Sequence, residues 1–227
     1  MGAAVRRLAS ASGAFSEVLA PARTDPFPDH ADVVIDFSRP EQTRKCLEWC
    51  QSRGVPLVIG TTGLDADDHR SIAAASEQVA VCQEANFSLG VHVLYALAEK
   101  AAVMLGEGFD SEVLEVHHRR KADAPSGTAL ELGRRLAAGR EPGRVSPSGS
   151  GRSGPREHGE IGVQALRGGD VAGEHTVFFL GDGERLELTH RAGGRELFAR
   201  GALRAAVLLS GRPAGLYGLA DLVGGSG

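Results

Sequence analysis

The stretch DVVIDFSRPEQTRKCLEWCQSRGVPLVIGTTG, residues 32–63, decides the fold class. An apolar run at each end is typical of a buried strand, and the segment between them has the length and polarity of a helix. Ser38 and Glu41 are predicted to form a capping box around a proline in the first turn, and Gly54 marks the end of the helix. The stretch therefore predicts a parallel βαβ unit.

The same alternation extends to both sides of this unit. Residues 2–12 are predicted to form a helix that ends at Gly13, and FSEVLA (15–20) is predicted to form a strand. A helix over 65–78, the strand VAVCQ and the turn ANFS follow the second apolar run. Right-handed crossovers place the carboxyl ends of parallel strands at one edge of the sheet, where open α/β sheets bind their ligands.

The pattern changes after residue 88. A long helix, GVHVLYALAEKAAVML, precedes the strand-like segments EVLEV, IGVQALRG, EHTVFFLGD and ERLELTHRAG. The last two meet at Gly181-Asp182-Gly183, which indicates a hairpin. A second, more antiparallel sheet is therefore expected, with a Gly/Ser/Pro/Arg-rich surface loop at 139–160 and a closing helix in ELFARGALRAAVLLSG.

Composition excludes several classes of function. The chain has 227 residues, 42% hydrophobic and 24% charged, with a net charge of −4, which favours a soluble globular protein over a nucleic-acid binder. The Arg-containing loop at 139–160 has no aromatic residues on which nucleic-acid bases could stack. Three cysteines without a CxxC pair indicate reduced thiols in the cytoplasm. No membrane span is predicted, because no apolar run approaches the length of about 20 residues that a bilayer requires.

The stretch EVLEVHHRRKADAPSGTAL, residues 112–130, contains a cluster of candidate catalytic and binding residues. A strand runs into His117, His118, two arginines and Lys121. Crowded cations repel one another, so the cluster calls for an anionic ligand, and a lysine in it can serve as a proton donor. Neighbouring strand residues point to opposite faces, and neither HExxH nor a Cys/His quartet is present, so no metal site is predicted.

The turn that follows is suited to an anion. Ser126-Gly127-Thr128 opens a predicted helix, and a helix N-terminus offers free N–H groups and partial positive charge to a carboxylate or phosphate. The alternative is that Ser126 is an ordinary N-cap and that the basic run is a solvated face.

These residues make the chain resemble the dihydrodipicolinate reductase family. EVHHRRKADAPSGTAL is similar to the family's signature motif over sixteen consecutive positions. VVIDFSRP, VIGTTG, ANFSLGV, RGGDVAGEHTV, ERLELTHRA and the tail FARGALRAA…GLYGLADLVG are similar to its other blocks, in the same order. The resemblance covers nearly the whole chain from Asp32 onward.

The resemblance implies an enzyme that reduces 4-hydroxy-tetrahydrodipicolinate, a cyclic dicarboxylate, to tetrahydrodipicolinate with loss of water. The hydride comes from NADPH or NADH, and the product enters diaminopimelate and lysine biosynthesis. By resemblance, His117 is catalytic, Lys121 is the proton donor, and the substrate is bound by His118, Ser126, Gly127 and Thr128. The residues implied for the cofactor are Gly60, Thr61, Thr62, Glu84, Ala85, Asn86 and Phe87, with Arg23 a candidate for a 2′-phosphate contact.

The expected fold is α/β with two domains. Residues 1–88 and 199–227 are expected to form a Rossmann-like, dinucleotide-binding domain without its first strand and glycine-rich loop. Residues 89–198 are expected to form an α+β mixed-sheet domain that binds the substrate and, as in the family, builds a homotetramer. The apolar alternation in HTVFFL and RLELTH suits an interface as well as a core.

The chain departs from the family at its start. The family begins with a strand and a GxxGRMG turn whose backbone N–H groups hold the pyrophosphate, whereas this chain opens with Met1-Gly2 and AAVRRLA. Our hypothesis is that Met1 is internal and that the natural protein starts roughly a dozen or more residues upstream. In-frame stop codons before Met1 would refute it. Two alternatives stay open: another nicotinamide-dependent imino- or amino-acid reductase, or a non-catalytic paralogue that senses a ligand.

Overall fold

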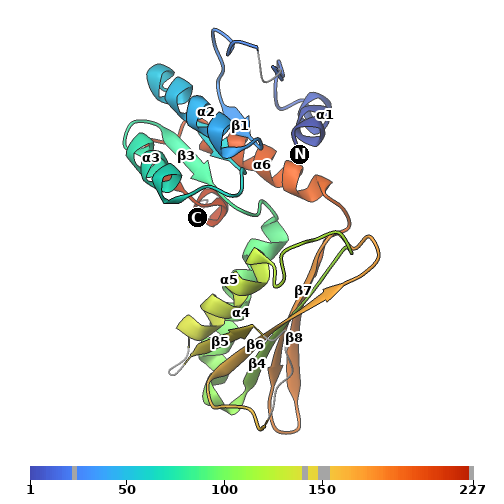
Figure 1. Cartoon of the computed structure of the whole chain (residues 1–227). Coiled ribbons are helices and arrows are strands. Elements are labelled where there is room, and N and C mark those ends of the chain that lie inside the picture. The colour runs from blue at the N-terminus through green and yellow to red at the C-terminus, as the bar shows by residue number, and fades with distance from the viewer. Residues whose placement is uncertain (22–24, 140–142, 148–153, 225–227) are drawn as a thin grey trace. The chain divides into compact units, whose positions relative to one another are not determined.

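The computed structural model describes residues 1–21, 25–139, 143–147 and 154–224. The chain forms two compact units (Figure 1). Unit 1 consists of Met1–Leu89 and Arg195–Gly227, and unit 2 consists of Gly90–Gly194.

Unit 1 is built on a sheet of four parallel strands in the order β1-β2-β3-β9. The strands are β1 (Val34–Asp36), β2 (Leu57–Ile59), β3 (Ala80–Gln83) and β9 (Gly215–Tyr217). The helices are α1 (Gly2–Ser12), α2 (Pro40–Arg53), α3 (Ala66–Ser76), α6 (Glu196–Leu209) and α7 (Leu219–Gly224). The predicted βαβ succession is confirmed, and it brings the carboxyl ends of β1, β2 and β3 to one edge.

Alternate strand residues bury opposite faces of this sheet. Leu57, Ile59 and Val81 pack against α2 and α3, whereas Val58 and Cys82 pack against α6 and α7. Both faces are covered, which is why the strands read as continuous apolar runs.

Two local predictions in unit 1 are wrong. Residues 15–20 form no strand, because the apolar side chains of Phe15 and Val18 pack with α1 and α6 instead of extending the sheet beside β1. The capping box before α2 does not form either: Arg39 is the N-cap residue and makes no side-chain cap hydrogen bond. The Ser38 hydroxyl donates to Asp36 instead. The predicted end of α1 is confirmed, since Gly13 is left-handed with φ 67°.

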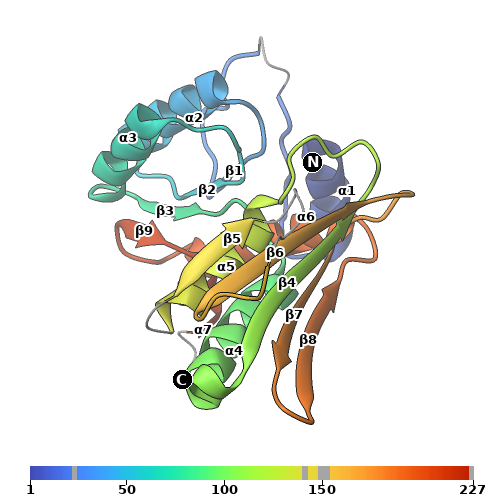
Figure 2. The same ribbon diagram turned by 60° about the horizontal axis from the view of Figure 1, so that its bottom comes forward.

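Unit 2 is a five-stranded mixed sheet in the order β5-β6-β4-β7-β8. β5, β6 and β4 are parallel to one another, whereas β7 is antiparallel to both β4 and β8. The sheet is therefore mixed and more antiparallel than that of unit 1, as predicted. Figure 2 shows the five strands side by side. The strands are β4 (Asp110–His117), β5 (Arg144–Pro147), β6 (Glu160–Arg167), β7 (Glu174–Leu180) and β8 (Arg185–Arg191).

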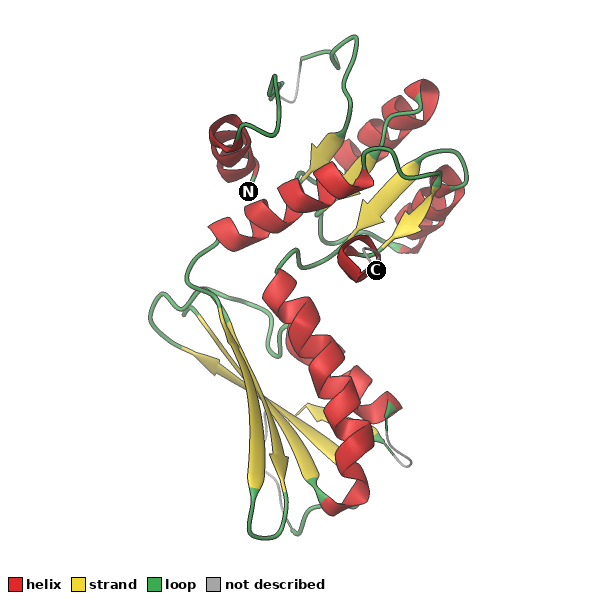
Figure 3. Cartoon of the chain, turned by 180° about the vertical axis from the view of Figure 1, so that it is seen from behind, coloured by secondary structure: helices red, strands yellow, loops and turns green. Residues whose placement is uncertain are grey.

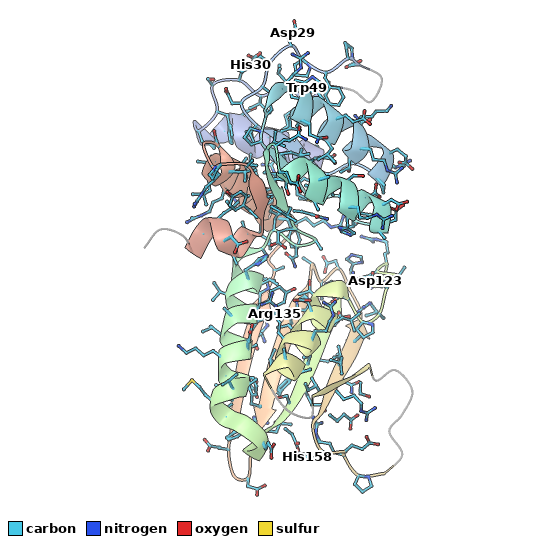
Figure 4. The ribbon with its side chains drawn as sticks, turned by 90° about the vertical axis from the view of Figure 1, so that its left-hand side faces the viewer. Asp29, His30, Trp49, Asp123, Arg135 and His158 are labelled. Carbon is cyan, nitrogen blue, oxygen red and sulfur yellow. The ribbon has the colours of Figure 1, made fainter. Side chains whose placement is uncertain are left out.

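Two helices cover one face of this sheet (Figure 3). They are α4 (Leu89–Leu105), which continues into the 3-10 turn η1 (Gly106–Gly108), and α5 (Gly127–Ala138). Arg135, labelled in Figure 4, lies on α5. Its guanidinium is 4.9 Å from the centre of the Tyr95 ring of α4 and forms an ion pair with Glu99. The helices and the inner face of the sheet share one apolar core.

The predicted loop at 139–160 contains a strand. Residues 144–147 form β5, which pairs with β6, and the Val145 side chain packs into the core beside Gly133. A side chain at Gly133 would meet Val145 at 3.0 Å, so this glycine lets α5 lie close to β5. The part of the loop at 148–153 lies outside the described residues.

The prediction that no segment is apolar enough to span a membrane is wrong for one helix. Leu89–Gly108 is long and apolar enough to cross a bilayer by length and composition alone. Its inward residues Val91, Leu94, Ala98 and Ala102 are buried in the core of unit 2.

Candidate active site

Strand β4 brings an acid and a base to the same face. Glu115 and His117 are two residues apart, so both side chains point inward, and as whole residues they are 0% and 9% exposed. The Glu115 carboxylate contacts Nδ1 of His117. A carboxylate can only accept here, so Nδ1 carries the proton and Nε2 is left to face outward from the pair.

The Glu115 carboxylate has two further partners. Arg167 at the end of β6 donates from both terminal nitrogens, at 2.8 Å to Oε2 and 2.7 Å to Oε1. The backbone N–H of Ser126 donates to Oε1 at 2.9 Å. Burial alone would raise the pKa of Glu115, but the hydrogen bonds from His117, Arg167 and Ser126 outweigh it and lower the pKa to about 2. Glu115 is therefore an anion throughout the physiological range.

Ser126 begins helix α5 as its N-cap, which confirms the predicted helix start. Its hydroxyl accepts the N–H of Ala129 at 3.2 Å and lies 3.3 Å from Nε2 of His175. The side chain is buried, so both the hydroxyl and the N–H of Ser126 are used within the protein. Gly127, the first helical residue, has no intrahelical acceptor for its N–H and is exposed, which leaves it able to meet an anion.

His175 of β7 completes the inner wall of this site. Its ring centre lies 5.2 Å from that of His117, with the two rings nearly perpendicular. Burial, followed by the nearby His117, lowers the pKa of His175 to about 3. His175 is thus a neutral imidazole at neutral pH, and its buried Nδ1 has no hydrogen-bond partner among the residues that the structure describes.

The remaining cationic residues lie on the turn between β4 and α5. The Nζ of Lys121 is 2.8 Å from Oδ2 of Asp123, and the lysine side chain is 21% exposed. This hydrogen bond is the main cause that lowers the pKa of Asp123. Arg167 also donates to the backbone carbonyl of Asp123 at 2.6 Å, which ties the turn to β6. His118 is half-buried, and Arg119 and Arg120 are exposed.

The predicted cofactor residues gather at the carboxyl edge of the sheet of unit 1. Gly60, Thr61 and Thr62 follow β2, and residues 84–87 follow β3. The arrangement is organised by Asp36, which is 4% exposed at the end of β1. Its carboxylate accepts from the Thr61 hydroxyl at 3.0 Å, from the Ser38 N–H at 3.0 Å, and from the hydroxyls of Ser38 and Thr43.

Several side chains of this group are used within the protein. Glu84 accepts the N–H of Leu219 at 2.8 Å and so holds the start of α7. Asn86 accepts the N–H of Ser88 at 2.9 Å before α4 begins, and Phe87 is buried in the core. Thr62 and Ala85 are exposed at the strand ends. Arg23 lies outside the described residues.

Comparison with known proteins identifies the family. Residues 4–87 match the model described as "Dihydrodipicolinate reductase, N-terminus", and residues 90–223 match the one described as "Dihydrodipicolinate reductase, C-terminus". The chain belongs to the dihydrodipicolinate reductase family.

Curated relatives carry the name of the family's activity. The chain is 52% identical to the 4-hydroxy-tetrahydrodipicolinate reductase of Anaeromyxobacter sp. (strain Fw109-5), over 86% of this chain and 74% of that protein. It is 50% identical to the enzyme of the same name from Thiobacillus denitrificans, over 86% of this chain and 74% of that protein. The resemblance found in the sequence is confirmed.

A solved structure shows the same fold. The dipicolinate-bound dihydrodipicolinate reductase from Paenisporosarcina sp. TG-14 matches with a TM-score of 0.67 and 25% identity, over 84% of this chain and 72% of that one. The predicted fold class is confirmed: a parallel sheet in one unit and a mixed sheet in the other.

Membership in this family of reductases confirms the enzyme class and the nicotinamide cofactor. The edge of the sheet fits such a nucleotide. A side chain at Gly60 would lie 2.1 Å from the Phe37 ring, so glycine is what keeps the end of β2 against that ring. Gly63 is left-handed with φ +78°, and the exposed Thr62 between the two glycines adds a hydroxyl. Backbone and hydroxyl groups of this kind suit a dinucleotide.

Sequence reasoning missed three residues of the site in unit 2: Glu115, Arg167 and His175. Glu115 had a signal, because a charged residue two positions before His117 must share its inward face. Arg167 and His175 lie in the block RGGDVAGEHTV that resembles the family, but no local pattern tied them to the site, since they are 52 and 49 residues from their partners Glu115 and Ser126. Within the described residues, no three His, Cys, Asp or Glu side chains are placed to hold a metal ion.

Proposed function

We propose that this chain reduces 4-hydroxy-tetrahydrodipicolinate to tetrahydrodipicolinate, with loss of water, in diaminopimelate and lysine biosynthesis. Relatives at 50–52% identity are named for this activity, which favours it over the two alternatives of another reductase or a non-catalytic paralogue. The observation that carries the proposal is the buried His117–Glu115 pair next to the N-terminus of α5.

The N-terminus of α5 is suited to one carboxylate of the substrate. The Gly127 N–H and the Thr128 hydroxyl would bind it, helped by the positive end of the helix dipole. Ser126 would act through the helix cap, because its own polar atoms are already used within the protein. His118 would contact the substrate from the turn. The solved relative is named as binding dipicolinate, a dicarboxylate ring.

Reduction with loss of water consumes one hydride and one proton. NADPH or NADH, when bound, supplies the hydride. Lys121 would supply the proton, and the adjacent Asp123 keeps its ammonium in place. His117 would be the catalytic histidine of the same site, with Nε2 directed outward from Glu115. Gly60, Thr61, Thr62 and residues 84–87 would hold the nucleotide in unit 1, the dinucleotide-binding domain; the Arg23 contact stays a prediction.

Two measurements test this function separately. The first follows the loss of nicotinamide absorbance with freshly generated substrate and either NADPH or NADH. Lys121→Met should lower kcat by about 100-fold or more, and Lys100→Met, on the exposed face of α4, should leave it unchanged. The second is a thermal shift with dipicolinate, which needs no nucleotide. A chain that neither turns over nor is stabilised by dipicolinate would contradict the proposal.

We also propose that unit 2 assembles the chain into a homotetramer in the cytoplasm. The face of its sheet that α4 and α5 leave open carries the partly exposed Leu114, Val116 and Phe178, and Leu166 is 53% exposed. An apolar sheet face of this kind suits a second copy of the chain. Native mass spectrometry should give a tetramer for the wild type and smaller species for Leu166→Lys. A monomeric wild type, or recovery in the membrane fraction, would count against this part of the proposal.

A further inference from the structure

Glu115 contacts three parts of the substrate site at once. Its carboxylate meets Nδ1 of His117, both terminal nitrogens of Arg167, and the N–H of Ser126 at the start of α5. The side chain is fully buried, so it cannot itself reach a bound substrate. Any role in the reaction must therefore pass through the groups it touches.

The two oxygens of Glu115 have different partners. Oε1 accepts from the Ser126 N–H and from Nη2 of Arg167, which are both obligate donors. Oε2 accepts from Nη1 of Arg167 and faces Nδ1 of His117. Because the carboxylate has no proton to give, it selects the tautomer of His117 with the proton on Nδ1 and the lone pair on Nε2.

The opposite edge of His117 is kept open by a glycine. A side chain at Gly173 would lie 2.9 Å from Nε2 of His117, and the backbone there has φ +149°, which disfavours other residues. The space at Nε2 is thus preserved, and 11% of the His117 side chain remains exposed. The tautomer that Glu115 selects presents an acceptor to that space.

We propose that Glu115 is a positioning residue that fixes the tautomer and orientation of His117, with Arg167 holding the carboxylate in place. This inference rests on the proposed function for its catalytic consequence, but the tautomer itself is a property of the chain alone. In the comparable histidine–carboxylate pair of serine proteases, an amide in place of the carboxylate leaves the geometry intact and gives the wrong tautomer.

Glu115→Gln tests the proposal because its two ends are not equivalent. The amide oxygen should take the Oε1 position, where two obligate donors meet, and the NH₂ should then face His117. That NH₂ donates to Nδ1 and forces the proton onto Nε2. Nitrogen NMR of ¹⁵N-histidine-labelled protein in mildly alkaline buffer, assigned with His117→Gln, should show the proton on Nδ1 in the wild type and on Nε2 in Glu115→Gln.

The kinetic effect should fall on turnover. Glu115→Gln should lower kcat by about 100-fold, within the range of general acid–base catalysis, and should change dipicolinate affinity by less than about threefold because the Ser126 contact is kept. Equal losses in kcat and dipicolinate affinity would overturn the proposal. So would a wild-type proton on Nε2, or the same tautomer in both proteins. If the wild type itself shows no turnover, the proposed function fails while the tautomer comparison still decides this inference.

A double variant separates positioning from folding. Glu115→Gln alone leaves Arg167, 18% exposed, without its counter-charge and should lower the unfolding midpoint. Adding Arg167→Met removes that charge and should recover stability. The tautomer and the loss in kcat should persist in the double variant. Recovery of wild-type turnover along with stability would show that Glu115 is only structural.

Discussion

Asp36 in unit 1 and Glu115 in unit 2 are both buried carboxylates near the ends of strands, but their partners differ. Asp36 accepts from the hydroxyls of Ser38, Thr43 and Thr61 and from a backbone N–H. Glu115 accepts from an arginine, a histidine and a backbone N–H. Neutral donors fix the shape of a turn, whereas charged and titratable donors also govern where protons reside. In the proposed function, the first cluster would shape the turns that meet the nucleotide, and the second would fix the proton of His117.

The largest loss of stability is expected when Arg167 is removed from the Glu115 cluster. Arg167→Met leaves the buried Glu115 charge with His117 and the Ser126 N–H but without its cationic partner, and should cost about 3–5 kcal/mol in the free energy of unfolding. Urea unfolding followed by circular dichroism measures it. Arg70→Met, which breaks an exposed pair, is the control and should cost less than about 1 kcal/mol. Similar losses in both variants would mean that burial of Glu115 has no energetic weight.

A smaller loss of stability is expected when the Asp36 cluster is altered. Asp36→Asn keeps one acceptor but directs an NH₂ group at hydroxyl and N–H donors, which should cost about 1–3 kcal/mol. Trp49, the only tryptophan in the chain, lies on α2 in unit 1, so its fluorescence reports on this unit during urea unfolding. We expect a raised KM for the nucleotide and an unchanged kcat. No change in the unfolding curve would show that the Asp36 cluster is not needed to hold the turn.

The pH dependence of stability should differ between the clusters. The pKa of His175 is about 3 in the folded state and 6.5 in the unfolded state. Below pH 6.5 the unfolded state therefore binds a proton at His175 that the folded state does not bind. The contribution of His175 to the free energy of unfolding is fully present above pH 6.5. It falls by about 2 kcal/mol between pH 7 and pH 5. Glu115, with a folded pKa of about 2 against 4.5, adds a further loss that begins near 4.5.

Urea unfolding at a series of pH values checks this dependence. His175→Gln should flatten the curve between 6.5 and 4.5 and leave the steeper limb below it. His30→Gln, at an 81% exposed side chain, is the matched control and should reproduce the wild-type slope. An unchanged slope in His175→Gln would show that His175 is not held neutral by burial.

The smallest effect is expected from a single hydroxyl. Thr43→Val removes one donor to Asp36 at constant shape and should cost about 1 kcal/mol, whereas Thr43→Ser keeps the hydroxyl and should cost less. Trp49 fluorescence during urea unfolding distinguishes the two. If serine were as costly as valine, the methyl group would matter rather than the hydrogen bond to Asp36.

The sequence predicts the part of the fold that depends on local pattern. The runs DVVIDF and VPLVIG are apolar on both faces because both faces of the sheet are covered, and their turns carry glycine at the required positions. FSEVLA has the same apolar character but packs on helices, and whether an apolar segment pairs or packs depends on neighbours that its own residues do not encode. The capping box failed for a similar reason, because Ser38 donates to Asp36 instead.

The candidate site divides in the same way. His117, Lys121 and the start of α5 follow from consecutive residues, and the structure brings His117 and Ser126 to the same carboxylate. Arg167 arrives from a strand paired beside β4, so its contact with Glu115 is set by sheet register. Register depends on long-range pairing, which a local motif does not specify.

The measurement that tests this account most directly is kcat at saturating substrate and nucleotide for Glu115→Gln and Asp36→Asn side by side. We expect a fall of about 100-fold for Glu115→Gln and a change of less than about threefold for Asp36→Asn. Equal falls in the two variants, or a larger fall for Asp36→Asn, would contradict the assignment of proton chemistry to the Glu115 cluster.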